Sequence, residues 1–439
     1  MRPGPRRVLL HVLLSITASL TIFGSDGTGG ASSPWREAKL PSWVTLGGQI
    51  RTRFEMPLNA RYEPGQQDGY IGNRLRFNIK VQPASWFKVF AEAQDVRVFG
   101  YDSGSRPGSL HNPLDLHQAW MEIGGAEQSR LSLKVGRQEL KYAGGYLFSS
   151  ADWAINARVY DAAVLSTTVA GWKGDFVAGG VVLADASRPD RRHAGEQFFG
   201  TDWQKTKSIP AATLELFAFA RKQAGVVSER GAAGDALTWS SGARVTGKVI
   251  PSVDYSVLFV RQFGTWSADR TSSWAGIYSA GWTIAGARWK PRMSAEYDAA
   301  SGDHNQRDGT RQAFEGLYGA YHYFLGEADR LGWRNARSVR AGVDFVPAKN
   351  WKVLIDVRDL SLMTVTDGLY SATFAREALN RLADSRHVGM EGDISFMWTV
   401  NARTKLAGGI GHIFPGRYLM QSTPGGHYTF PYVMISRQF

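Results

Sequence analysis

Apolar and polar residues alternate along most of the chain from residue 46 onward. Residues 74–81 show the pattern clearly, reading Arg74-Leu-Arg-Phe-Asn-Ile-Lys-Val81. Successive side chains of a β-strand point to opposite faces, so this spacing predicts strands with one apolar and one polar face. The same alternation recurs at 46–55, 339–345, 351–358 and 391–400.

Turn residues divide these runs into about eighteen expected strands. We expect them to begin near residues 46, 74, 86, 117, 129, 159, 172, 212, 238, 253, 272, 287, 316, 337, 351, 387, 403 and 428. Short turns such as 82–85 alternate with longer loops rich in Gly, Asp and Asn, such as 100–113. An even number of strands with short turns on one side and long loops on the other is typical of an outer-membrane barrel. The fold class predicted is therefore all-β, a transmembrane antiparallel β-barrel.

Composition separates this barrel from a soluble sandwich or propeller, which would also alternate. The chain has 15 Trp, 16 Tyr and 22 Phe, and only 21% of its residues are charged. Several Trp residues, including Trp86, Trp172 and Trp351, fall at expected strand ends, where an interfacial girdle would place them. The last residues, 428–439, form an aromatic-rich strand ending in Phe439, which resembles the assembly sequence of outer-membrane barrels. The chain has no Cys, which excludes a disulfide scaffold, a thiolate metal site and a Cys nucleophile.

The N-terminus predicts secretion. Arg2, Arg6 and Arg7 precede an apolar stretch at 8–23 and then small residues, the layout of a signal peptide. A membrane-anchor helix is the alternative, although the stretch is short for a full span. We therefore expect a signal peptide at 1–25, a short periplasmic segment at 26–45 and an outer-membrane β-barrel at 46–439.

The polar face of the strands is basic. Removing the three N-terminal arginines lowers the formal charge only from +12 to +9, and many remaining cations alternate with apolar residues. The residues expected to line the lumen are Arg51, Arg53, Arg74, Arg76, Arg340 and Arg358, with Asp344 among them. Guanidinium groups in a narrow pore attract anions and recognise carboxylates. The alternative is an ordinary ion-paired barrel interior, and nucleic acid is excluded by the compartment.

Catalytic and metal motifs are weak in this sequence. We find no phosphate loop, zinc-binding His pair or nucleophile elbow, and we expect no cofactor. Oxygen ligands at Asp303, Asn305 and Asp308 could hold calcium, with a solvated loop as the alternative. Asp344 and Asp356 could form a glycosidase pair, but among arginines they are better read as counter-ions.

Several blocks in order resemble the bacterial alginate-export outer-membrane proteins. These blocks are 116–122, 131–140, Asp152-Trp153, 156–161, 296–303, 314–318, 328–335, 387–391 and 409–417. The resemblance implies a monomeric eighteen-stranded barrel whose arginine-lined constriction conducts an anionic uronic-acid polysaccharide. It also implies that Arg137 and Arg158 lie at that constriction, with Asp161 near them. The chain departs from the family pattern at 143–146, where a further basic residue is expected.

The leading hypothesis is an outer-membrane channel that exports an anionic polysaccharide without covalent chemistry. The alternative is an anion-selective uptake porin for small acidic nutrients. A barrel enzyme is the third class, and it would need an acid/base set that the sequence does not show. The expected partners are the anionic glycan or sugar, outer-membrane lipid and periplasmic secretion scaffold proteins.

Overall fold

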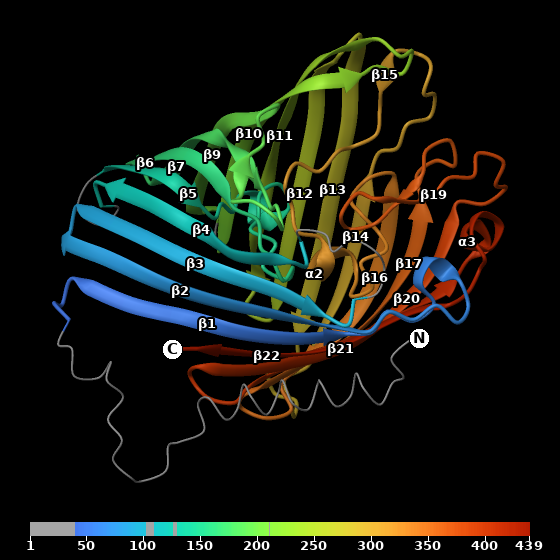
Figure 1. Cartoon of the computed structure of the whole chain (residues 1–439). Coiled ribbons are helices and arrows are strands. Elements are labelled where there is room, and N and C mark those ends of the chain that lie inside the picture. Colours follow the sequence, from blue (N-terminus) through green and yellow to red (C-terminus); the bar gives the residue numbers. More distant parts are fainter. Residues whose placement is uncertain (1–39, 102–108, 126–129, 210) are drawn as a thin grey trace.

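The eighteen long strands in the described part of the chain form one closed antiparallel barrel (Figure 1). The computed structural model describes residues 40–101, 109–125, 130–209 and 211–439. The barrel strands are β1 (Val44–Glu55), β2 (Tyr70–Ala84), β3 (Phe87–Phe99), β4 (Asn112–Ile123), β5 (Leu131–Gln138), β6 (Tyr160–Val169), β7 (Trp172–Leu183), β9 (Glu196–Ile209), β10 (Ala212–Val227), β11 (Ala233–Ile250), β12 (Val253–Trp266), β13 (Asp269–Thr283), β14 (Arg292–Ala300), β16 (Ala336–Phe345), β17 (Trp351–Leu362), β20 (His387–Thr399), β21 (Thr404–Pro415) and β22 (Tyr428–Gln438).

Shorter elements lie in the connections between these strands. They are the two- and three-residue strands β8 (Arg191–Arg192), β15 (Thr310–Arg311), β18 (Leu369–Tyr370) and β19 (Arg376–Ala378), the helices α2 (His322–Leu325) and α3 (Arg417–Ser422), and the 3-10 turns η1 (Ala60–Tyr62) and η2 (Ala143–Gly145). None of the helices in the described residues is long and apolar enough to cross a membrane.

The first and last strands close the barrel. β1 pairs with β22 in antiparallel register from Gln49↔Gln438 to Glu55↔Tyr432. Beyond that register, Gly48 and Phe439 exchange two backbone hydrogen bonds of 3.1 Å each. Closure leaves no long strand edge unpaired, which a barrel requires in lipid. The predicted fold class is confirmed, and the barrel begins at Val44, two residues before the position expected. The expected signal peptide lies outside the described residues.

The strand count agrees with the prediction through two compensating errors. β9, which pairs with both β7 and β10, was not among the expected strands. The strand expected near residue 316 does not form, because the chain folds into the lumen there. The inward face of β9 carries both Phe198 and Asp202, and both are buried. Apolar and polar residues therefore share one face of this strand, and its sequence does not show the regular alternation. In the segment near 316, Phe314 and Trp333 are fully buried and pack in the interior rather than facing lipid.

The burial pattern along the strands is the reverse of that in a soluble protein. On β2, Leu75 and Phe77 are 49% and 52% exposed, whereas Arg74, which points to the other face of the strand, is 1% exposed. Apolar residues therefore cover the outer wall and charged residues point inward. Lipid solvates the outer wall, so this arrangement is the stable one for a membrane barrel.

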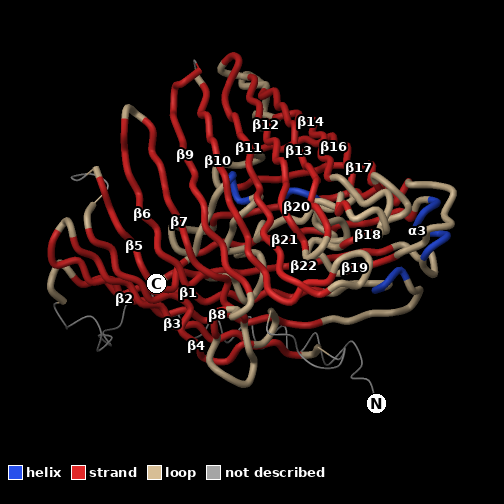
Figure 2. The backbone as a smooth tube through the Cα atoms, turned by 90° about the horizontal axis from the view of Figure 1, so that it is seen from above, coloured by secondary structure: helices blue, strands red, loops and turns tan. Residues whose placement is uncertain are grey.

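Two long connections fold into the lumen. They are residues 139–159, between β5 and β6, and residues 301–335, between β14 and β16; the view in Figure 2 shows loops inside the ring of strands. Tyr146, Phe148, Tyr318 and Trp333 from these connections form a hydrophobic core with the inward residues of β6 to β13, among them Phe198 and Phe219. These strands thus contribute an apolar, covered part of the inner wall, although Arg221 of β10 and Arg244 of β11 also lie there, paired with Glu315 and Glu215.

Candidate functional site

An arginine ladder lines the inner face of β1 and β2. Arg51 and Arg53 alternate on β1, and Arg74 and Arg76 alternate on β2; none is more than 8% exposed. The strand register places Arg51 directly opposite Arg74. Like charges at opposing positions repel each other, so the ladder needs a counter-charge.

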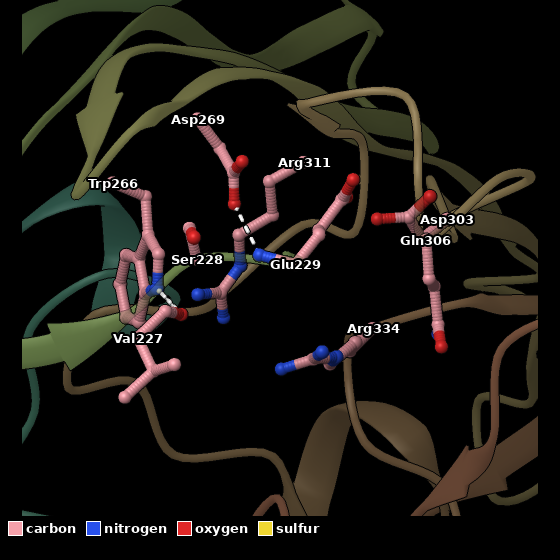
Figure 3. A pocket seen from close by; sticks show the side chains of 9 residues that line it. All are labelled: Val227, Ser228, Glu229, Trp266, Asp269, Asp303, Gln306, Arg311 and Arg334. Carbon is pink, nitrogen blue, oxygen red and sulfur yellow. Dashed lines mark hydrogen bonds between the residues drawn. The ribbon is translucent and has the colours of Figure 1, made fainter. Parts of the chain in front are cut away.

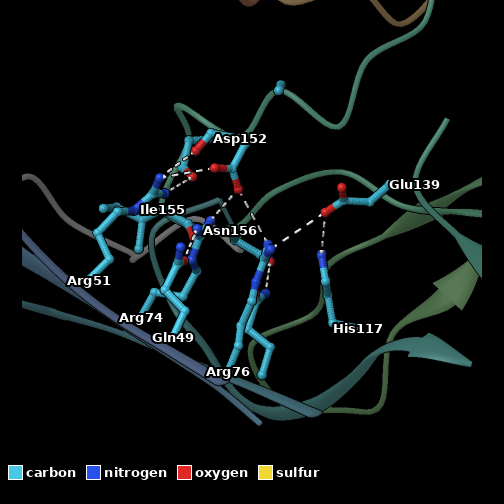
Figure 4. A network of polar contacts seen from close by, with 12 residues as sticks. Gln49, Arg51, Arg74, Arg76, His117, Glu139, Asp152, Ile155 and Asn156 are labelled. Atoms are coloured by element: carbon cyan, nitrogen blue, oxygen red, sulfur yellow. Dashed lines mark hydrogen bonds and ion pairs between the residues drawn. The ribbon is translucent and has the colours of Figure 1, made fainter. Parts of the chain in front are cut away.

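Asp152 of the first inward connection supplies that counter-charge. Its carboxylate lies 2.8 Å from Arg74 Nη1, 3.5 Å from Arg51 Nη1 and 3.6 Å from Arg76 Nη2 (Figure 4). Burial would raise the pKa of Asp152, but the three guanidinium groups hold it below its ordinary value. Arg53 pairs with Glu55, and Arg76 also lies 3.9 Å from Glu92 and 3.5 Å from Glu139, so each ladder arginine has a carboxylate partner.

The remaining guanidinium donors hold the same connection by its backbone. Arg51 donates to the carbonyl oxygens of Asp152 and Ala154, each at 2.6 Å. Arg53 donates to the Trp153 carbonyl, and its guanidinium carbon lies 4.0 Å from the centroid of the Trp153 ring. The ladder therefore fixes residues 152–154 against the wall.

Arg76 extends this network toward β3 and β4. Its Nε donates to Gln94 Oε1 at 2.6 Å, and its Nη1 lies 3.5 Å from Glu139. Glu139 also contacts the Nε2 atom of His117, at 3.1 Å. Figure 4 shows these side chains converging from several strands onto the connection that follows β5.

The wall formed by β14 to β20, which β21 and β22 separate from β1, mixes cations and acids. Arg358 lies 3.3 Å from Asp356 and 3.6 Å from Glu296, and it donates to the Phe324 carbonyl at 2.9 Å. Arg340 lies 3.2 Å from Asp356. Asp344 lies 3.2 Å from Arg292. Here the expected lumen residues face inward, as the alternation predicted, but each is paired with a neighbour.

Arg158 joins the two inward connections rather than standing free in the pore. Its Nη1 donates to the carbonyl oxygens of Tyr318 and Gly319, the second at 3.3 Å. The rings of Tyr146 and Phe324 stack nearby, with centroids 3.8 Å apart. Arg158 thus ties the first inward connection to the backbone of the second.

Arg137 and Asp161 lie elsewhere, and this corrects the expected site. Arg137 is on the same face of β5 as the exposed Leu131, Leu133 and Val135, whereas its neighbour Gln138 is buried on the inner face. The Arg137 guanidinium makes two hydrogen bonds to Asp161, of 2.8 and 3.2 Å. The parity of β5 points Arg137 outward, and the parity of β6, where Tyr160 and Ala162 are buried, points its partner Asp161 outward as well, so motif position alone misassigned them.

A cavity of about 800 Å³ lies between the ladder, the inward connections and the turn-side end of β17 to β22. It is lined by seven Arg and Lys side chains and by the carboxylates of Asp152, Glu327 and Asp344. The cations are Arg51, Lys141, Arg292, Arg340, Lys352, Arg403 and Lys405. Lys141, Arg292, Lys352, Arg403 and Lys405 were not among the expected lumen residues. For Lys352 the alternation at 351–358 was a usable signal, because it places this side chain on the polar face of the strand.

The expected calcium ligands take part in loop structure instead. Asp303 Oδ1 accepts the Asn305 amide at 3.1 Å, and Asp308 Oδ1 accepts the Thr310 amide at 2.8 Å. Asp303 lines a cavity of about 220 Å³ with Glu229, Arg311 and Arg334 (Figure 3). Among the residues that the structure describes, no group of His, Asp and Glu has the arrangement of a metal site.

The closed barrel, its lipid-facing apolar wall and its charged interior define an outer-membrane β-barrel of the porin type, located in the bacterial outer membrane. The chain belongs to the alginate export family, whose model matches residues 42–428. This confirms the resemblance drawn from the sequence blocks.

Solved structures share the fold at low sequence identity. Pseudomonas aeruginosa OpdO is 11% identical, with a TM-score of 0.59, covering 90% of this chain and 97% of its own. A BenF-like porin from Pseudomonas fluorescens Pf-5 is 9% identical, with a TM-score of 0.60 and coverages of 90% and 98%. Acinetobacter baumannii OccAB2 is 10% identical, with a TM-score of 0.58 and coverages of 91% and 99%. A search of curated proteins finds no match.

Proposed function

We propose that this barrel exports an anionic, uronic-acid polysaccharide of the alginate type across the outer membrane. The observation that carries the proposal is the charge of the cavity, where seven cations face three carboxylates. A low-dielectric passage with excess positive charge admits anions and excludes cations. Membership of the alginate export family supports the same direction and substrate class.

The mechanism is electrostatic selection without covalent chemistry. The exposed side chains of Lys141, Lys352 and Lys405 offer point charges that bind a carboxylate weakly and release it. The buried ladder arginines supply a fixed background potential, because their donors are already used by Asp152 and the connection backbone. A polymer would pass from one exposed cation to the next, driven by synthesis on the periplasmic side.

An anion-selective uptake porin for small acidic nutrients is the second candidate. It is favoured by the two inward connections, whose aromatic core lies inside the barrel and narrows the lumen. A passage reduced in this way suits a single small anion, whereas an extended chain would need the connections to move apart.

Conductance in planar bilayers tests the proposal. Under a salt gradient we expect the sign of the reversal potential to show that anions permeate better than cations. A cation-selective channel would refute both candidates. Uronate oligomers of increasing length then separate the two. An export pore should be blocked more strongly by longer chains, whereas an uptake pore should saturate with the monomer. Turnover of a glycan or phospholipid by the purified protein would instead indicate an enzyme.

A further inference from the structure

The outer wall carries a polar niche that the transport function does not use. It has a volume of about 440 Å³ and is lined by Arg270, Ser272 and Trp274 of β13 and by the loop that follows β14. That loop contributes His304, Asp308 and Thr310. Arg270, Ser272 and Trp274 alternate with Thr271 and Ser273, which are buried on the inner face. The niche therefore opens on the lipid side of the barrel.

The backbone around the niche is well tied together. β14 ends at Ala300, so the upper half of β13 pairs instead with β15, through Arg270↔Thr310 and Thr271↔Arg311. Ser301 Oγ accepts the Trp274 amide at 2.9 Å and donates to the Gln312 carbonyl at 2.7 Å. The Arg270 amide donates to the Gly309 carbonyl at 2.9 Å. These bonds make the niche a structured feature of the wall.

The position of the niche relative to the membrane follows from the spacing of two Trp residues on β13. Trp282, at the turn end, is 51% exposed, and Trp274 lies eight residues nearer the loop end on the same face. A strand needs roughly 9–11 residues to cross a bilayer, and aromatic residues mark both interfaces. Trp274 then lies at the outer interface, and Ser272 and Arg270 lie one and two steps above it, at the level of the lipid headgroups.

The charges of the niche are available to a ligand. Arg270 is exposed, and among the described residues no hydrogen bond or ion pair engages its guanidinium. Arg261 of β12, also exposed and paired in register with Trp274, donates to Ser272 Oγ at 2.6 Å and to the Ser273 carbonyl at 3.0 Å. These bonds turn its guanidinium toward the niche. Asp308 is the one acid lining it, and its Oδ1 already accepts the Thr310 amide.

We propose that this niche binds the phosphorylated sugar headgroup of an outer-leaflet glycolipid. Two arginines provide charge-assisted donors for a phosphate. The hydroxyls of Ser272 and Thr310 and the Trp274 ring provide the polar and flat surfaces that a sugar contacts. An unpaired Arg on a lipid-facing wall costs little at the interface and more at the midplane, so its placement at headgroup height fits a headgroup partner.

The test uses purified, detergent-solubilised full-length barrel titrated with bisphosphorylated lipid A, with the bound fraction counted by native mass spectrometry. We expect Arg270→Ala to weaken binding about tenfold, as expected for loss of one charge-assisted contact. Lys222→Ala is the matched control, because Lys222 is an exposed cation on β10 outside the niche, paired with the outward Leu237. It should leave the affinity unchanged. Heat-modifiable gel migration checks that each variant is folded.

Two further arms decide the kind of ligand. Lipid A stripped of its phosphates should bind wild type and Arg270→Ala equally weakly. Inorganic phosphate at concentrations matching the lipid should not displace it. Equal affinities of wild type and Arg270→Ala for the bisphosphorylated lipid, equal losses in Arg270→Ala and Lys222→Ala, or displacement by free phosphate would each overturn the proposal.

Discussion

The indole of Trp153 stacks on the imidazole of His322, with ring centroids 3.7 Å apart and planes inclined by 6°. Trp153 belongs to the connection after β5 and His322 to the connection after β14, so this contact joins the two segments that narrow the lumen. Arg53 lies against the same indole, which links the joined segments to the arginine ladder. The stacked pair therefore connects the arginine ladder to both inward connections.

The first prediction concerns the protonation of His322. Its Nδ1 lies 2.9 Å from Asp329 and its Nε2 lies 3.1 Å from Glu327. Burial would lower the pKa of His322, but the two carboxylates outweigh it and raise the pKa from 6.5 to about 9. Because the pKa is higher in the folded state, protonated His322 contributes its full stabilisation below pH 6.5, and this stabilisation is lost as the pH rises through 9. We expect single-channel current fluctuations to increase between pH 6.5 and pH 9 and above. His322→Gln, which cannot take up the proton, should remove the pH dependence, and its persistence in that variant would contradict the assignment.

The second prediction concerns Asp152. Asp152→Asn leaves Arg51, Arg74 and Arg76 without their shared carboxylate. Removing one partner of a buried ion network costs several kcal/mol, but Asp152 is about half exposed, so we expect roughly 1–2 kcal/mol. Residues 139–159 should become sensitive to added chymotrypsin, and the conductance should rise. Unchanged proteolysis of this segment would show that its backbone bonds alone hold it.

The third prediction separates the inner and outer cations. Lys352→Glu and Lys405→Glu place negative charge in the cavity, so the anion-to-cation permeability ratio should fall severalfold. Arg137→Ala is the matched control, because Arg137 lies on the outer face with Asp161. It should leave the reversal potential unchanged. If Arg137→Ala shifted the reversal potential as much as the lysine variants do, Arg137 would have to be assigned to the pore.

The fourth prediction concerns the seam of the barrel. A Cβ at Gly48 would lie 2.4 Å from the Phe439 ring and 2.6 Å from the Arg76 carbonyl oxygen. Because one of these neighbours is backbone, Gly48→Val must push β1 away from its partners. We expect slower folding into detergent or lipid, measured by the heat-modifiable gel shift. Gly392→Val is a control, since no atom lies within 4 Å of the Cβ that would be added there.

The outer wall and most of its strands were predictable from the sequence because both depend on local alternation. Leu75, Phe77 and Ile79 are spaced by two residues, and strand geometry alone sends them to one face. The arginine ladder followed from the same rule, since Arg51, Arg53, Arg74 and Arg76 occupy the opposite parity. Alternation failed at β9, which was missed, and near residue 316, where a strand was wrongly expected. Beside β9 the inner wall is itself apolar, because a segment folded into the lumen covers it, so the two faces of the strand do not differ clearly in polarity.

The amino-acid sequence by itself determined a barrel with an apolar outside and many cations on its inner face, and the family to which the chain belongs. Only the tertiary structure decided which charges face the open passage. Asp152 meets three arginines more than 75 residues away in the chain, and Arg137 turns outward although its motif resembles that of a pore residue. Side-chain direction along one strand is a local property, whereas the counter-charge that each side chain meets depends on where distant connections fold. For that reason the buried ladder arginines hold the first inward connection, and Lys141, Lys352 and Lys405 line the cavity.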